Sequence, residues 1–225
     1  MRKLILFDID GTLIDNVGDD HKFRRTIRKV HDIEVRTKGD FRGYTDYLIL
    51  GALLEGEGWD DAMIDTAMPV LLAELERDHA ANFEPERVVV LPGVVKLLDA
   101  LERQGTVLGL ITGNMKSISE RKLATVGLWD YFTVGGFGND PHKVRADLVR
   151  LAVERAGFSN ESENVWVIGD TPRDIEAIHA AGLKHSVGVA NGFRPLAELE
   201  AAGAEVVFED LRNTELVVGK LLSLS

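Results

Sequence analysis

The chain of 225 residues contains no cysteine. Disulfide bonds, a thiolate nucleophile and a cysteine-ligated metal are therefore excluded. Basic residues are fewer than acidic ones: the chain has 26 Lys and Arg and 37 Asp and Glu, which gives a formal net charge of −11. That balance argues against a nucleic-acid-binding protein, since a phosphate backbone needs clustered cations. It favours a protein that holds a divalent cation among its acids.

Long hydrophobic runs, internal repeats and Pro-rich linkers are missing as well. The N-terminus passes into the short apolar run Leu4-Ile5-Leu6-Phe7 and then into charged residues, so we expect neither a signal peptide nor a membrane-spanning segment. With 45% hydrophobic residues, the chain can bury a full core in one large domain, or in a core domain with a second one inserted. We expect a cytoplasmic protein.

From residue 88 onward, apolar strands alternate with amphipathic helices. The strands are expected at 106–111, 131–134, 165–168, 185–190 and 205–208, and helices separate them and follow the last one. This alternation predicts an α/β fold with a doubly wound, Rossmann-like parallel sheet, helices on both faces and right-handed crossovers.

Residues 15–86 interrupt the alternation directly after the first strand. Apolar residues recur there at helical spacing over 19–32, 45–55 and 60–80, and Pro69 interrupts the last of these. We therefore predict an all-helical cap domain over 15–86, inserted into a core domain made of 1–14 and 87–225. An insert at the end of the first strand is expected to lie over the site, exclude water and select the substrate. The alternative is an insertion without a role in the site.

Polar residues follow the apolar strands, at the sheet edge where doubly wound folds bind their ligands. These positions are Asp8 and Asp10, Thr112 with Gly113 and Asn114, the loop before residue 143, and Asp170. Two acids at the mouth of an apolar strand are electrostatically costly unless something binds them. The pattern therefore predicts one site in which these positions converge.

Four segments in this order resemble the motifs of the haloacid dehalogenase (HAD) superfamily. They are Asp8-Ile9-Asp10-Gly11-Thr12-Leu13, Thr112 at a strand end, Lys143 at a helix start, and Gly169-Asp170-Thr171-Pro172-Arg173-Asp174. The insertion resembles a C1-type helical cap, and the chain is most similar to the phosphoglycolate phosphatase and β-phosphoglucomutase branch. The resemblance implies a Mg²⁺-dependent phosphatase for a small phosphorylated metabolite, phosphoglycolate-like or a sugar phosphate, that works through an aspartyl-phosphate.

The chemistry of the acids agrees with this resemblance. Asp8 is the candidate nucleophile, because a carboxylate can attack phosphorus and split hydrolysis into two steps. Asp10 is the candidate general acid and base. Because an anionic carboxylate attacks an anionic phosphate, we expect Mg²⁺ to neutralise part of their negative charge. By resemblance, Asp8 and Asp170 are its carboxylate ligands, Asp10 adds its backbone carbonyl, and Asp174 supports them.

The hydroxyl of Thr112 and the amides of Gly113 and Asn114 suit a phosphoryl group, although a threonine at a strand end is otherwise a routine helix cap. A cation for the phosphate is expected from Lys143. The family usually shows Lys-Pro here, whereas this chain has Lys143-Val144. Arg145 could take the role instead, and we favour Lys143.

Within the predicted cap, Arg42-Gly43-Tyr44-Thr45-Asp46 resembles the substrate-specificity loop of C1 caps. Gly43 would allow close approach of the backbone, and Arg42 could pair with an anionic group of the substrate. An ordinary interhelical turn is the alternative.

Two other functions stay open from the sequence. A phosphomutase of the β-phosphoglucomutase kind would use the same core and return the phosphoryl group to the substrate. A phospho-aspartate signalling or scaffold protein is the non-enzyme alternative, although receiver domains are about half as long and lack the insert. We expect a small phosphorylated substrate, no nucleic acid, no membrane, and a monomer or a homodimer.

Overall fold

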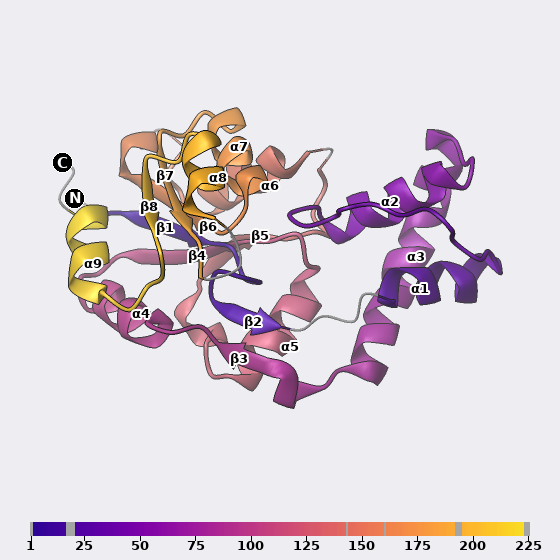
Figure 1. Ribbon diagram of the computed structural model, residues 1–225, viewed down its shortest axis with the longest axis horizontal. Helices are drawn as coiled ribbons and strands as arrows, with labels where there is room; N and C mark the ends of the chain where they lie inside the picture. Colours follow the sequence, from indigo (N-terminus) through magenta and orange to yellow (C-terminus); the bar gives the residue numbers. More distant parts are fainter. Residues whose placement is uncertain (1, 17–20, 143, 160, 192–194, 223–225) are drawn as a thin grey trace.

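The computed structural model describes residues 2–16, 21–142, 144–159, 161–191 and 195–222. Within these residues a six-stranded parallel sheet has the order β5-β4-β1-β6-β7-β8 (Figure 1). The strands are β1 (Leu4–Phe7), β4 (Val107–Ile111), β5 (Val134–Gly136), β6 (Val165–Gly169), β7 (His185–Val189) and β8 (Val206–Phe208). The predicted doubly wound α/β sheet is confirmed.

Strand β1 lies in the middle of the sheet because its four residues are all apolar and fully buried. Its neighbours are β4 and β6, and Phe7 pairs with both Leu110 and Ile168. This register brings the carboxyl ends of the three strands to the same level. The polar residues that follow each strand therefore emerge side by side.

Helices cover both faces of the sheet. Ile5 and Phe7 of β1 face a core shared with α4 (Val94–Arg103), α5 (Lys116–Thr125) and α9 (Thr214–Leu222). Leu4 and Leu6 face a core shared with α6 (Arg145–Arg155), α7 (Pro172–Ala180) and α8 (Leu196–Ala201). The two-residue alternation along β1 thus supplies side chains to two separate apolar layers.

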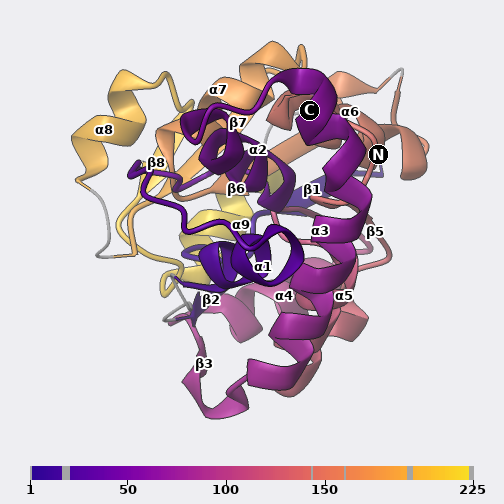
Figure 2. The same cartoon turned by 90° about the vertical axis from the view of Figure 1, so that its right-hand side faces the viewer.

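The segment after β1 begins and ends in a short antiparallel pair, β2 (Ile14–Asn16) with β3 (Val88–Val90). Between them lie α1 (Lys22–His31), α2 (Asp46–Gly56) and α3 (Asp61–Asn82), which form an apolar cluster largely their own. Figures 1 and 2 show these three helices packed together beyond the carboxyl edge of the sheet. We call α1–α3 with their loops the helical insert. Its division into a domain at 15–86 stays a prediction.

The structure corrects two local predictions and adds one pair of strands. Pro69 does not interrupt α3, which runs through it for 22 residues, because buried Leu71 and Leu75 hold the following turns. The pair of β2 and β3 was not predicted, since three residues carry too little periodicity. The strand expected at 131–134 is wrong. Residues 129–131 form a 3₁₀ turn, and β5 starts only at Val134. Tyr131 and Phe132 suggested a strand because they are apolar, but they pack against the core without belonging to one.

Two further 3₁₀ turns, Pro85–Arg87 and Ser162–Asn164, lead into β3 and β6. Among the helices that the structure describes, none combines the length and the apolarity needed to cross a bilayer.

Candidate active site

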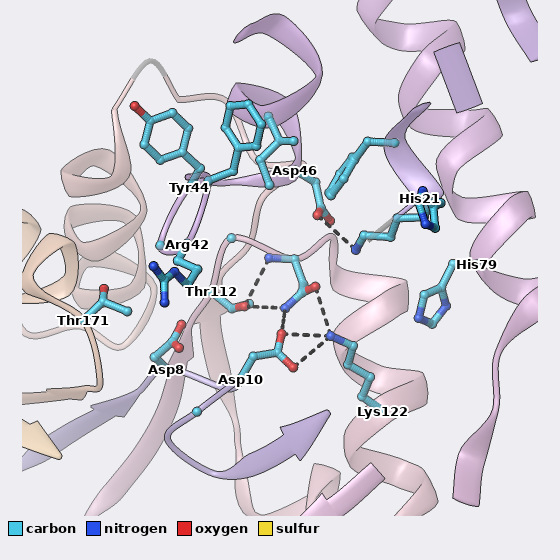
Figure 3. Close-up of a pocket in the computed structure, with 18 of the residues that line it drawn as sticks. Asp8, Asp10, His21, Arg42, Tyr44, Asp46, His79, Thr112, Lys122 and Thr171 are labelled. Carbon is cyan, nitrogen blue, oxygen red and sulfur yellow. Dashed lines mark hydrogen bonds and ion pairs between the residues drawn. The ribbon is translucent and has the colours of Figure 1, made fainter. Parts of the chain in front are cut away.

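The polar strand ends converge on one cavity of about 820 Å³ between the sheet edge and the helical insert (Figure 3). Asp8 and Asp10 reach it from the end of β1, Thr112 with Gly113 and Asn114 from the end of β4, and Asp170 with Asp174 from the end of β6. The insert contributes the opposite wall, including Lys22, Arg42 and His79. The structure therefore brings together the acids, hydroxyl and amides that were predicted separately.

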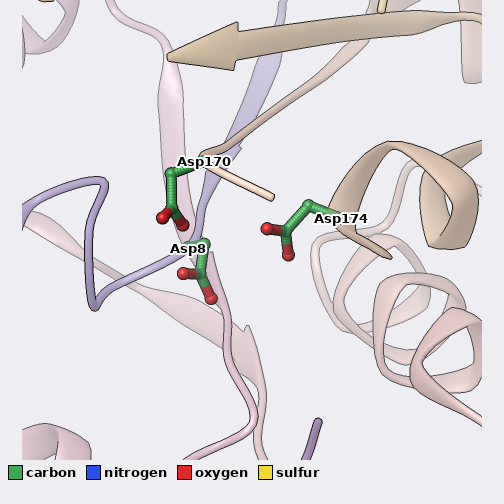
Figure 4. A group of neighbouring side chains, drawn as sticks. All are labelled: Asp8, Asp170 and Asp174. Atoms are coloured by element: carbon green, nitrogen blue, oxygen red, sulfur yellow. The ribbon is translucent and has the colours of Figure 1, made fainter. Parts of the chain in front are cut away.

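Asp8, Asp170 and Asp174 form a buried acid cluster in which one carboxylate oxygen of each lies within 4.8 Å of the others (Figure 4). Asp174 Oδ2 accepts hydrogen bonds from the backbone N–H (2.9 Å) and the hydroxyl (2.6 Å) of Thr171 at the start of α7. Asp170 Oδ1 is buried and has no hydrogen-bond partner among the residues that the structure describes. All donors are carboxylate oxygens, which suits a hard divalent cation.

Burial and the neighbouring carboxylates both disfavour the ionisation of Asp8 and Asp170. Burial, followed by the neighbouring Asp174 carboxylate, raises the pKa of Asp8 to about 7. Burial, followed by Asp174 and Asp8, raises the pKa of Asp170 to about 9. A bound cation would stabilise the negative charges of Asp8 and Asp170, which are unfavourable in its absence.

Among the described residues, Arg145 is the cation that contacts the acid cluster. Its Nη2 donates to Asp8 Oδ1 at 2.7 Å and forms an ion pair with Asp174 Oδ1 at 2.5 Å, while Nη1 donates to the carbonyl of Gly43 at 3.3 Å. Lys143, the cation we favoured from the sequence, lies outside the described residues. The geometry thus supports Arg145 for the third-motif position and leaves the prediction for Lys143 untested.

Thr112 is buried, and its Oγ1 accepts hydrogen bonds from the backbone N–H and the side-chain amide of Asn114, both at 3.1 Å. Two accepted bonds leave the hydroxyl hydrogen of Thr112 free to be donated to a ligand. The backbone amide of Asn114, which we predicted for a phosphoryl group, is engaged by Thr112 in a local side-chain turn.

Lys122 is a site residue that was not predicted from the sequence. Its Nζ lies 2.9 Å from Asp10 Oδ1, 2.8 Å from Asp10 Oδ2 and 3.2 Å from Asn114 Oδ1. Burial is the largest single influence and would raise the pKa of Asp10, but Lys122, together with Asn114 and Lys22, outweighs burial, and the net effect lowers that pKa. One signal was available: Lys122 shares the buried face of α5 with Ile118 and Ser119, at helical spacings of four and three.

The loop that resembled a specificity loop contacts the core directly. Gly43 has φ +77°, and a Cβ at this position would lie 2.9 Å from Thr171 Oγ1, so a glycine is needed for the approach. The carbonyl of Arg42 accepts a hydrogen bond from Arg173 at 2.6 Å. The Arg42 side chain, in contrast, is held by Asp40 at 2.7 to 2.8 Å, and it is 65% exposed.

Gly11 has a similar role in the first turn after β1. Its φ is +86°, and an added Cβ would collide with the carboxylate of Asp170. The glycine of the Asp8–Leu13 segment therefore allows the acids of β1 and β6 to come together.

Comparison with known proteins agrees with this geometry. The family model of haloacid dehalogenase-like hydrolases matches residues 2–182. The chain is 30% identical over 224 residues to a phosphoglycolate phosphatase of Pseudomonas syringae pv. syringae, covering 94% of this chain and 78% of that protein. It is also 30% identical over 223 residues to a phosphoglycolate phosphatase of Pseudomonas fluorescens, covering 93% and 77%.

Solved structures show the same fold. A hydrolase from Pseudomonas syringae superposes with a TM-score of 0.72 at 22% identity, covering 97% of this chain and 99% of that one. A β-phosphoglucomutase from Clostridium difficile superposes with a TM-score of 0.72 at 18% identity, covering 99% and 98%. The family model spans most of the sequence, and the motifs follow one another in the expected order on this fold. The chain belongs to the haloacid dehalogenase-like hydrolases, and the prediction of a hydrolytic enzyme of that superfamily is confirmed.

Proposed function

We propose that the protein is a Mg²⁺-dependent phosphatase that hydrolyses a small phosphorylated metabolite through an aspartyl-phosphate on Asp8. The observation that carries this proposal is the contact between Arg145 Nη2 and Asp8 Oδ1, at 2.7 Å, beside the cavity. The contact orients a buried carboxylate and supplies a cation for the phosphoryl oxygens in the same place. Because the relatives are named phosphoglycolate phosphatases, phosphoglycolate is the first substrate to test.

The residues account for both halves of the reaction. With Oδ1 held by Arg145, Asp8 attacks phosphorus through Oδ2, and the bond between phosphorus and the ester oxygen breaks. Asp10, in its protonated form, gives its proton to the departing alkoxide. Water then attacks the phosphoryl group on Asp8 and returns a proton to Asp10, which releases phosphate and restores the Asp8 carboxylate. The Thr112 hydroxyl is placed to donate to a phosphoryl oxygen throughout.

A divalent metal fits the acid cluster. One sign is Asp170 Oδ1, which is buried without a hydrogen-bond partner in the described part of the chain, and the raised pKa values of Asp8 and Asp170 are another. Asp8 and Asp170 would hold the metal together with the backbone carbonyl of Asp10, and Asp174 would support them from α7. Bound Mg²⁺ supplies positive charge that offsets the repulsion between the Asp8 carboxylate and the phosphate dianion.

The test is a screen of phosphorylated metabolites with and without Mg²⁺, with Asp8→Asn as the inactive variant and Asp130→Asn, at an exposed position, as its control. We expect phosphate release that requires Mg²⁺, disappears in Asp8→Asn and persists in Asp130→Asn. Retained turnover in Asp8→Asn would exclude the covalent mechanism. Isomerisation of a sugar phosphate without phosphate release would indicate the mutase, and stable phosphorylation of Asp8 without turnover would indicate a signalling protein. The cytoplasmic location and the monomeric or homodimeric state remain predictions.

A further inference from the structure

Lys122 is a buried ammonium that lies beside the carboxylate of Asp10 in the cavity lining. Its side chain is 4% exposed, whereas that of Asp10 is 37% exposed. The Nζ contacts that the structure describes are to the two Asp10 oxygens and to Asn114 Oδ1. Burying an ammonium is unfavourable unless a carboxylate lies in good geometry to offset the loss of water. The contact of Lys122 with Asp10 therefore favours one orientation of the Asp10 carboxylate.

Lys122 and Asn114 together determine the orientation of the Asp10 carboxylate. Lys122 Nζ is nearly equidistant from Oδ1 and Oδ2, at 2.9 and 2.8 Å, which fixes the direction of the group. Asn114 Nδ2 donates to Oδ2 at 2.6 Å, which fixes the rotation of the carboxylate plane. Oδ2 thus accepts from two donors and Oδ1 from one. Oδ1 is the oxygen better able to exchange a proton with a ligand in the cavity.

The helix that carries Lys122 is joined directly to the phosphoryl-facing loop. Helix α5 begins at Lys116, two residues after Asn114, and buried Ile118, Ser119 and Leu123 anchor it to the protein interior. Asn114 also contacts Thr112 Oγ1. The hydrogen-bonded chain Thr112–Asn114–Asp10–Lys122 therefore links the residue expected to bind phosphate with the residue expected to move protons.

We propose that Lys122 is a positioning residue for proton transfer by Asp10, holding its carboxylate at the cavity wall beside Asp8. This inference rests on the proposed function and goes beyond it, because Lys122 belongs to none of the four motif segments. In the first step the proton leaves Asp10 for the ester oxygen as the phosphorus–oxygen bond breaks. In the second step Asp10 takes a proton from the attacking water. Lys122 keeps its own protons in both steps.

The test compares leaving groups in the variant Lys122→Met, which keeps the length and burial of the side chain without its charge. An alkyl phosphate needs a proton on its leaving oxygen, whereas p-nitrophenyl phosphate does not. We expect kcat/KM to fall about 10- to 100-fold for the alkyl ester and less than about 3-fold for the aryl ester. Lys122→Arg should restore part of the loss, and Lys116→Met, on the exposed face of the same helix, should lose nothing. Equal losses on both esters, or none, would overturn the inference.

A double variant separates positioning from a general structural effect. If Lys122 acts through Asp10, adding Lys122→Met to Asp10→Asn should cause no further loss of kcat on the alkyl ester. A further loss of tenfold or more would contradict the proposal. If the wild-type protein hydrolyses no monoester, the proposed function fails, and crystal structures of wild type and Lys122→Met decide the inference separately. A carboxylate of Asp10 that rotates away from Asn114 in the variant supports it, and an unchanged carboxylate refutes it.

Discussion

The carboxylate of Asp46 accepts a hydrogen bond from the backbone N–H of Met115, with 3.0 Å between Met115 N and Asp46 Oδ2. The backbone N–H of Asp46 donates in turn to the carbonyl of Gly113 at 2.8 Å. Asp46 begins α2 in the helical insert, and Gly113 and Met115 belong to the loop after β4. A buried acid therefore docks the insert onto the loop that presents Thr112 to the cavity.

Replacing this acid should loosen the docking. Asp46→Ala leaves the Met115 N–H buried without an acceptor, which costs about 1–3 kcal/mol of stability. We also expect a higher KM, because the insert forms one wall of the cavity. Substrate kinetics and thermal unfolding measure the two effects, with Asp61→Ala as the control, since Asp61 is an exposed acid at the start of α3. An unchanged KM in Asp46→Ala would show that the contact has no part in binding.

Paired substitutions can separate the two cations considered for the third motif. Arg145→Met should reduce phosphate release by about 100-fold or more and destabilise the protein by about 3–5 kcal/mol, since it removes the buried contacts of Arg145 with Asp8 and Asp174. Lys143→Met should keep activity within a few fold. Steady-state kinetics and denaturant unfolding of both variants provide the measurement. A larger loss in Lys143→Met than in Arg145→Met would reverse the assignment.

Metal binding should be visible in stability as well as in activity. At a concentration one hundred times its Kd, Mg²⁺ should stabilise the protein by about 2.7 kcal/mol. In Asp170→Asn this shift should be lost, while the metal-free variant should be more stable than metal-free wild type, because ionisation of Asp170 is unfavourable in its buried setting. Thermal unfolding in chelator and in Mg²⁺ tests both effects, with Asp130→Asn as the surface control. A full Mg²⁺ shift in Asp170→Asn would place the metal elsewhere.

His79 should make stability depend on pH below neutrality. Burial, followed by the positive charges of Lys122, Lys22 and Arg121, lowers the pKa of His79 from 6.5 to about 4. The unfolded chain therefore takes up the proton first, so the contribution of His79 to stability is present above pH 6.5 and is lost as the pH falls toward 4. Between pH 7 and 5 we expect a loss of about 1 kcal/mol, after a discount for solvent screening. His79→Gln should remove this component of the unfolding curve measured against pH. An unchanged pH profile in that variant would mean that His79 titrates normally.

Local sequence was informative wherever a site residue directly follows an apolar strand. Asp8, Thr112 and Asp170 could be located because short apolar runs define β1, β4 and β6, and parallel strands bring their carboxyl ends to one edge. The same reasoning failed at β5, where two of the three residues are glycine, and at β2 and β3, where three residues are too few to show a period.

The sequence by itself determined the doubly wound core, the helical insert and the acids at the strand ends, because each depends on neighbouring residues or on a regular period. Only the tertiary structure decided which side chains accompany those acids. Lys122 meets Asp10 across 112 residues, and Met115 meets Asp46 across 69. Contacts over such separations depend on the packing of α5 against the sheet and of the insert against the loop after β4. Helical spacing can place Lys122 on the buried face of α5 with Ile118 and Ser119, but no local pattern shows which distant residue it meets there.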